Sequence, residues 1–272
     1  MFPLRDDNPT RRFPIVTILL ILINVGVYLL VQPQGQQLLG QAETDVEVSR
    51  FSYEYAAIPC EVTTGEPLSA DELPDAQGDI NGCDRGASSA PPIFPDKQVW
   101  LAVLLSMFLH GSLVHLGGNM LFLWVFGNNI EDHLGPVRFL VVYLIAGIVA
   151  TGAHVLVQPD STIPLVGASG AVAGVMGAYL IWFPNAPVLT AIFFFFIQEV
   201  RAKWLLGFWF LSQFFVNPNS GVAWMAHVGG FVFGVAIGLL VRASHAARGL
   251  AWREHYLEPD LDPFSDRRPR RY

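Results

Sequence analysis

Long apolar runs alternate with short polar connections along the chain, and a transmembrane helix needs about 20 mostly apolar residues. Four uncharged runs have roughly this length: Phe13–Val31, Gly111–Ile130, Phe139–Gln158 and Gly221–Val241. A fifth run, Ile163–Pro184, opens with Pro164 and Gly167, so we expect a short helix from about Ser169 to Phe183. The runs predict a helical membrane protein, because a backbone in lipid must satisfy its own polar groups.

The apolar stretch after Pro184 is harder to divide into spans. Ala186–Gln198 includes four consecutive Phe residues, and Glu199, Arg201 and Lys203 follow it closely. We interpret this segment as interfacial or re-entrant, and Trp204–Phe215 as the core of another span. The prediction is an all-α, polytopic bundle of six transmembrane helices. If Ala186–Gln198 also crossed the bilayer, there would be seven.

Composition supports the membrane class. The 272 residues are 52% hydrophobic and only 14% charged, with a mean hydropathy of +0.42, whereas a soluble domain has about 25% charged residues. These values exclude a soluble globular enzyme, a disordered chain and a fibrous protein. The formal charge is −7 and the cations form no basic surface, so the expected partner is the lipid bilayer and not nucleic acid.

The distribution of cations predicts the orientation. With six spans, 13 of the 16 Lys and Arg residues lie on the side that holds both termini, and the positive-inside rule makes that side cytoplasmic. We expect the plasma (inner) membrane of a bacterium, with the first span retained as an anchor. The predicted divisions are a cytoplasmic N-terminus (1–12), a first transmembrane helix (13–31), an acidic extracytoplasmic loop (32–98), a catalytic core (99–241) and a basic cytoplasmic tail (242–272).

The loop 32–98 holds 12 acidic and 3 basic residues and shows no sustained periodicity. We expect it to be poorly ordered or a small accessory loop. Both cysteines, Cys60 and Cys83, lie in it, so a disulfide is plausible on the extracytoplasmic side. Two free thiols are the alternative. The charged end of the tail, 257–272, is expected to be disordered.

Polar residues inside membrane helices are costly and are candidates for function. His115 and Asn119 are four residues apart and therefore share one helix face. The alternative for this pair is polar packing between helices. His110 precedes His115 by five residues, which does not suit a metal pair, and no Cys or Glu joins them, so no metal site and no cofactor are expected.

Ser169 and His227 each stand next to a row of small residues that lets helices pack closely. The rows are Gly170, Gly174 and Ala178 in one helix and Gly230, Gly234 and Gly238 in the other. With one span between them, the two helices begin on the same side, where His115 and Asn119 also lie. A serine within reach of a histidine is the minimum activated nucleophile. The alternative is that Ser169 is only a small packing residue.

Four motifs taken together resemble the rhomboid family of intramembrane serine proteases: HGSLVHLGGN (110–119), GNNIED (127–132), GASG (167–170) and AHVGG (226–230). The resemblance implies that Ser169 is the nucleophile and His227 its general base, without an aspartate. It also implies that His115 and Asn119, with the backbone N–H of Ser169, stabilise the oxyanion. Ala173 departs from relatives in which a Tyr stacks on the histidine.

By the same resemblance, 98–109 is a membrane-embedded loop and 204–215 belongs to a mobile helix through which substrate enters. The implied function is an intramembrane serine endopeptidase that cleaves single-span transmembrane substrates near the extracytoplasmic side.

One alternative is an inactive rhomboid-like protein that binds membrane clients, which would be expected to lack Ser169 or His227. A small transporter or channel is a second alternative, but we find neither repeated halves nor charges within the spans. The sequence does not indicate an oligomeric state.

Overall fold

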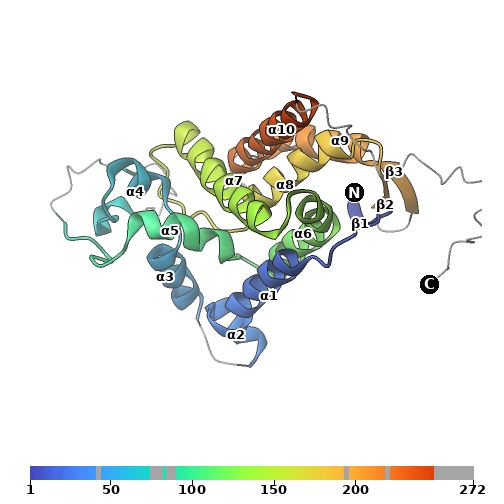
Figure 1. The fold of residues 1–272 in the computed structure, drawn as a ribbon. Coiled ribbons are helices and arrows are strands. Elements are labelled where there is room, and N and C mark those ends of the chain that lie inside the picture. Colours follow the sequence, from blue (N-terminus) through green and yellow to red (C-terminus); the bar gives the residue numbers. More distant parts are fainter. Residues whose placement is uncertain (41–43, 74–81, 84–89, 193–195, 218–220, 248–272) are drawn as a thin grey trace, which may run out of the picture.

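The computed structural model describes residues 1–40, 44–73, 82–83, 90–192, 196–217 and 221–247, and shows a mostly helical chain with one small sheet (Figure 1). The elements in chain order are β1 (Phe2–Asp6), α1 (Ile15–Leu30), α2 (Pro33–Leu38), α3 (Asp45–Tyr55), α4 (Pro59–Thr64), η1 (Ala70–Glu72), α5 (Val99–Leu105), η2 (Ser106–Phe108), α6 (Leu113–Leu134), α7 (Pro136–Val157), α8 (Ser169–Trp182), β2 (Pro187–Ile192), β3 (Phe196–Arg201), α9 (Ala202–Ser212), η3 (Gln213–Phe215) and α10 (Trp224–Ala247).

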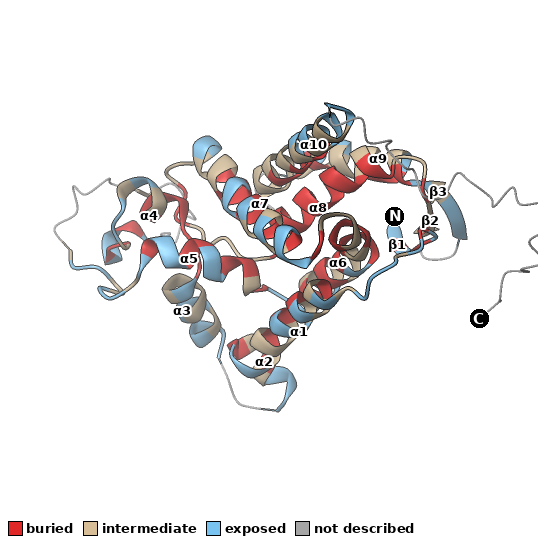
Figure 2. Cartoon of the chain, viewed as in Figure 1, coloured by how far each residue is buried: buried red, intermediate tan, exposed pale blue. Residues whose placement is uncertain are grey.

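Helix α8 forms the centre of the bundle and packs against α6, α7 and α10 (Figure 1). Almost all of its residues are buried, as the red ribbon of α8 in Figure 2 shows. It has 14 residues and begins at Ser169, so the predicted short helix is confirmed. At 1.5 Å per residue it is about 21 Å long, which is less than the ~30 Å hydrocarbon core.

The predicted glycine rows bring α8 and α10 into backbone contact. A Cβ atom at Gly230 would lie 2.0 Å from the carbonyl oxygen of Gly170, and one at Gly234 would lie 1.9 Å from that of Gly174. Real Cβ atoms do not approach a backbone oxygen so closely, so both positions require glycine. Small residues therefore set the spacing between the two helices, as expected.

Two adjacent acids at the end of α6 hold the start of α1. The Glu131 carboxylate accepts hydrogen bonds from the backbone N–H groups of Val16 (2.9 Å) and Thr17 (2.8 Å). Asp132 accepts one from the N–H of Arg12 (2.9 Å). The first N–H groups of a helix lack partners within it, and α1 has no side-chain cap of its own. These bonds give the acidic end of the GNNIED segment a structural role.

A three-stranded antiparallel sheet corrects the all-α expectation. Strand β1 pairs with β2, and β2 pairs with β3, with Pro187 opposite Arg201 and Ile192 opposite Phe196. The segment interpreted as interfacial or re-entrant therefore doubles back as a hairpin, which excludes a seventh helix there. Residues 193–195 lie outside the described part. The sequence pattern missed the sheet because β1, which completes it, lies about 180 residues away in the chain.

Helices α7 and α10 are each long and apolar enough to cross a membrane. Helix α6, together with the α5–η2 segment, makes a third candidate if the pair, bent by 79°, counts as one span. Helices α1 and α8 are apolar but shorter. The count of six spans thus stays a prediction. Most of the predicted tail, 248–272, lies outside the described residues.

The loop before α5 contains an ordered accessory unit, which we define as the described residues of 45–97. A disulfide joins Cys60 and Cys83. The expected disulfide is therefore present, and the alternative of two free thiols is wrong. The Lys97 ammonium lies 2.6 Å from the Glu61 carboxylate, and both side chains are almost fully buried. Burial raises the pKa of Glu61 and lowers that of Lys97, while the ion pair opposes both shifts.

The accessory unit contacts the segment that leads into α8. The backbone N–H of Leu165 donates to the carbonyl oxygen of Ala57 (2.7 Å). The N–H of Ala57 in turn donates to the Ser106 hydroxyl (2.6 Å), and the Ser106 carbonyl accepts from the N–H of Gly167 (2.9 Å). The unit therefore supports the chain immediately before Ser169 from outside the helix bundle.

Candidate active site

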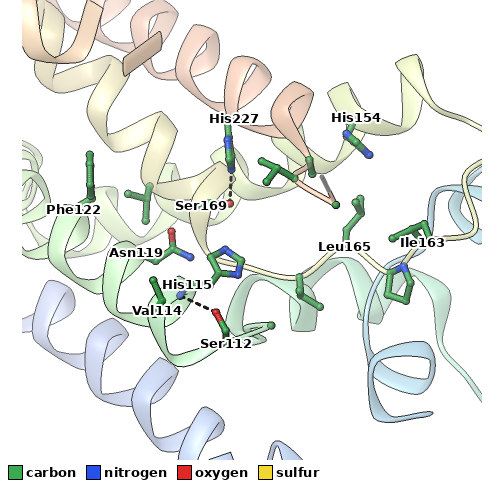
Figure 3. Close-up of a pocket in the computed structure, with 18 of the residues that line it drawn as sticks. Ser112, Val114, His115, Asn119, Phe122, His154, Ile163, Leu165, Ser169 and His227 are labelled. Carbon is green, nitrogen blue, oxygen red and sulfur yellow. Dashed lines mark hydrogen bonds between the residues drawn. The ribbon is translucent and has the colours of Figure 1, made fainter. Parts of the chain in front are cut away.

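Ser169 and His227 form a hydrogen bond at one end of the bundle. Ser169 is the first residue of α8, and His227 lies in the first turn of α10. The Nε2 atom of His227 is 2.9 Å from the Ser169 Oγ atom, as the dashed line in Figure 3 shows. The two residues are 58 positions apart, and the close packing of the glycine rows brings them together.

His115 and Asn119 face the same space from α6, as predicted from their spacing (Figure 3). The Ser112 hydroxyl caps this helix by accepting the N–H of His115 (3.1 Å). The His115 ring lies close to Gly167, where a Cβ atom would be 2.8 Å from its Cε1 atom. Gly167 also has a φ of 130°, which side chains disfavour, so glycine is required there for two reasons.

Two hydrogen-bond donors at this site have no use within the described fold. The Nδ2 atom of Asn119 is buried and has no partner among the described residues. The N–H of Ser169 belongs to the first turn of α8, where N–H groups lack partners within the helix and carry a positive partial charge. Both donors could bind a negatively charged oxygen beside Ser169.

A cavity of about 910 Å³ opens over Ser169 and His227, and its wall includes His115, Asn119 and the segment 163–166. One water occupies ~30 Å³ in the liquid, so the cavity has room for water and for an extended peptide. A site that hydrolyses a bond within an apolar bundle needs such a space, because lipid excludes water.

Three residues of this site were not predicted. The Gln213 Oε1 atom lies 2.7 Å from Nδ1 of His227, the Trp209 ring packs 5.8 Å from the His227 ring, and His154 lines the cavity from α7. Gln213 and His154 are polar residues within predicted spans. The rule that selected His115 would therefore have found them.

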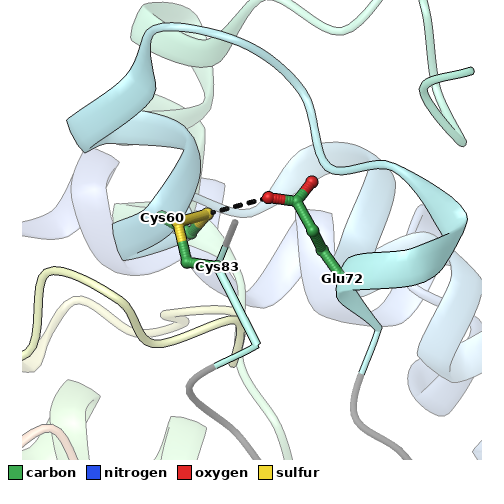
Figure 4. A group of neighbouring side chains, drawn as sticks. All are labelled: Cys60, Glu72 and Cys83. Atoms are coloured by element: carbon green, nitrogen blue, oxygen red, sulfur yellow. Dashed lines mark hydrogen bonds between the residues drawn. A yellow bond between two sulfur atoms is a disulfide. The ribbon is translucent and has the colours of Figure 1, made fainter. Parts of the chain in front are cut away.

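Among the described residues, one cluster has donor atoms close enough for a metal ion: Cys60, Cys83 and Glu72. Figure 4 shows the two sulfur atoms bonded to each other, with Glu72 beside them. A disulfide offers no thiolate to a metal. The cluster is therefore a structural element of the accessory unit, and none of its three residues lines the cavity over Ser169.

The apolar helices and the serine–histidine pair that faces a cavity define a helical membrane protein with an embedded candidate active site. The family model described as "Rhomboid domain" matches residues 96–244. This match covers more than half of the chain, and the chain belongs to the rhomboid family.

Curated relatives agree with this assignment. The chain is similar to "Rhomboid-like protease 3" of Toxoplasma gondii, with 29% identity over 56% of this chain and 55% of that protein. It is similar to "Rhomboid protease GluP" of Bacillus subtilis (strain 168), with 41% identity over 30% of this chain and 15% of that protein. It is also similar to "Rhomboid protein 1, mitochondrial" of Saccharomyces cerevisiae, with 30% identity over 51% of this chain and 41% of that protein.

The aligned part therefore spans about half or less of these relatives. One of them is named as mitochondrial and another is bacterial. The comparisons thus support a membrane protein, but they do not support the predicted bacterial inner membrane over other membranes.

Proposed function

We propose that this chain is an intramembrane serine endopeptidase. The observation that carries the proposal is the 2.9 Å contact between Ser169 Oγ and His227 Nε2, beside a cavity inside an apolar bundle. Two of the relatives are named as proteases. A rhomboid-like protein that only binds clients would have no need for this pair, so its presence favours an enzyme.

In the proposed reaction, His227 Nε2 accepts the hydroxyl proton while Ser169 Oγ attacks the carbonyl carbon of the scissile peptide bond. The tetrahedral oxyanion receives hydrogen bonds from the Ser169 N–H, from Asn119 Nδ2 and from His115. His227 then gives its proton to the departing amine. A water molecule in the cavity, deprotonated by His227, hydrolyses the acyl-enzyme and frees Ser169.

The proposed substrates are single-span membrane proteins whose helix unwinds near its outer end. Two features support this: the site lies at the first turns of α8 and α10, and α8 is shorter than the hydrocarbon core. We propose six spans with both termini on the cytoplasmic side, as the distribution of cations favours.

The test is cleavage of a model single-span substrate in detergent by purified wild-type protein and by Ser169→Ala. The control is Ser244→Ala on α10, because among the described residues the Ser244 hydroxyl bonds only the Val241 carbonyl oxygen of its own helix. We expect wild type and Ser244→Ala to cleave and Ser169→Ala to be inactive. Equal cleavage by Ser169→Ala would refute the assignment of the nucleophile.

A further inference from the structure

The far side of the His227 ring is bonded to an amide from another helix. The Nδ1 atom lies 2.7 Å from Oε1 of Gln213, which is in η3 at the end of α9. Nδ1 is the nitrogen that faces away from Ser169. Gln213 is 6% exposed, so the contact is shielded from water.

The surroundings of Gln213 decide which end of its amide faces the histidine. Its Nε2 atom donates to the carbonyl oxygen of Trp209 (3.0 Å) and to the Ser212 hydroxyl (3.2 Å). The Trp209 carbonyl can only accept, and the Ser212 hydroxyl already donates to it (2.6 Å). If the amide were flipped, the Gln213 Oε1 atom would lie against the Trp209 carbonyl oxygen with no proton between them. Oε1 must therefore be the atom that faces His227.

An amide oxygen can only accept a hydrogen bond, so the bond requires a proton on Nδ1 of His227. In a neutral imidazole the other nitrogen, Nε2, then carries the lone pair. That lone pair points at Ser169 Oγ, 2.9 Å away. In the opposite tautomer, Nε2 would carry a proton and could not accept one from serine.

We propose that Gln213 is a positioning residue that holds His227 in the tautomer able to accept the Ser169 proton. This inference rests on the proposed peptidase function. It also explains how the ring is fixed although position 173 is Ala, since Gln213 anchors Nδ1 and the Trp209 ring packs against the imidazole. Because Gln213 follows α9 directly, His227 is held in the tautomer that accepts the Ser169 proton only when this end of α9 lies against α10.

The test compares wild type with Gln213→Leu, which removes the acceptor, and Gln213→Glu, which keeps an acceptor of the same length. Gln198→Leu on the exposed strand β3 controls for the substitution itself. The readouts are kcat and KM for the model substrate, and the ¹⁵N spectrum of the His227 ring, which distinguishes the two tautomers.

We expect the proton on Nδ1 of His227 in wild type and a mixture of tautomers in Gln213→Leu. The kcat of Gln213→Leu should fall about 10-fold or more while KM changes less than about 2-fold, and Gln213→Glu should recover most of the loss. Gln198→Leu should behave as wild type.

A wild-type ring that carries its proton on Nε2 would overturn the proposal, and this measurement does not depend on the folding of any variant. An unchanged kcat in Gln213→Leu would also overturn it. Wild-type protein that shows the Nδ1 proton but cleaves nothing would instead refute the peptidase function. The ring spectrum therefore separates the two failures.

Discussion

Replacing Gly230 with Ala should separate α8 from α10 close to the candidate active site. Gly230 lies one turn beyond His227, and it faces Gly170, the neighbour of Ser169. The new Cβ atom would lie 2.0 Å from the Gly170 carbonyl oxygen, whereas ordinary contact begins at about 3.4 Å. The helices must therefore move apart by about 1.4 Å, because the obstacle is backbone and cannot rotate away.

A movement of this size would stretch the 2.9 Å contact between Ser169 and His227 beyond hydrogen-bond length. A misplacement of about 1 Å can cost roughly 100-fold in rate, so we expect kcat to fall by about 10- to 100-fold. The assay is cleavage of the model substrate, with the thermal midpoint measured in parallel. Gly152→Ala on α7 is the matched control, since a Cβ atom there meets nothing within 4 Å.

Cleavage by Gly230→Ala at the wild-type rate would show that the spacing of these helices does not position the pair. A loss of the same size in Gly152→Ala would show that the assay reports general damage from replacing a helical glycine. The first outcome would contradict a role for the glycine rows in aligning Ser169 with His227, and the second would remove the support that Gly230→Ala gives to it.

Three further predictions concern other parts of the molecule. Asn119→Ala should lower kcat about 10-fold or more with a smaller effect on KM, because the buried Asn119 amide would bind the oxyanion mainly in the transition state. Steady-state kinetics that show an unchanged kcat would exclude Asn119 from oxyanion stabilisation. Burial raises the pKa of Asp6 from 3.8 to about 6 although Tyr179 donates to its carboxylate, so the folded protein loses roughly 3 kcal/mol as pH rises from about 4 to above 6. Asp6→Asn should therefore raise the thermal midpoint at pH 7.5 but not at pH 4. An equal change in the thermal midpoint at both pH values would refute a cost of ionising Asp6. The Cys60–Cys83 disulfide closes a loop with a sequence separation of 23 and should contribute roughly 3 kcal/mol to the free energy of unfolding. Replacing both cysteines with Ala should therefore lower the thermal midpoint and speed proteolysis of the accessory unit. Unchanged proteolysis would show that the disulfide does not stabilise this unit.

Features that depend on local sequence could be predicted. The start of α8 follows from Pro164 and Gly167, which disfavour an earlier helix, and the length of α8 follows from that start. The glycine rows predicted close packing because residues four apart share a helix face. His115 and Asn119 were found because a polar side chain is conspicuous in an apolar run.

Features that depend on distant pairing could not be predicted. Strand β2 is completed by β1, and no periodicity near residue 190 refers to residues 2–6. The contact of Gln213 with His227 joins two elements whose relative placement the sequence does not state. The polar character of Gln213 was visible in the sequence, but its partner was not.

The order of the accessory unit could not be predicted for another reason. Its core is small, and the buried residues Ile58, Cys60 and Leu68 form most of it. A disulfide and a buried ion pair supplement this core. Such cross-links bring together residues far apart in the chain and leave no periodic pattern, so the sequence alone does not decide between a poorly ordered loop and a small accessory loop.

The most direct test of the proposed serine–histidine pair is to identify the residue that reacts with a fluorophosphonate, which traps activated serines. Purified wild-type protein, Ser169→Ala and His227→Ala are labelled, digested and mapped by mass spectrometry. The proposed mechanism predicts an adduct on Ser169 in wild type, none in Ser169→Ala, and labelling at least about 100-fold slower in His227→Ala. Equal labelling of wild type and Ser169→Ala, or an adduct on another residue, would contradict it.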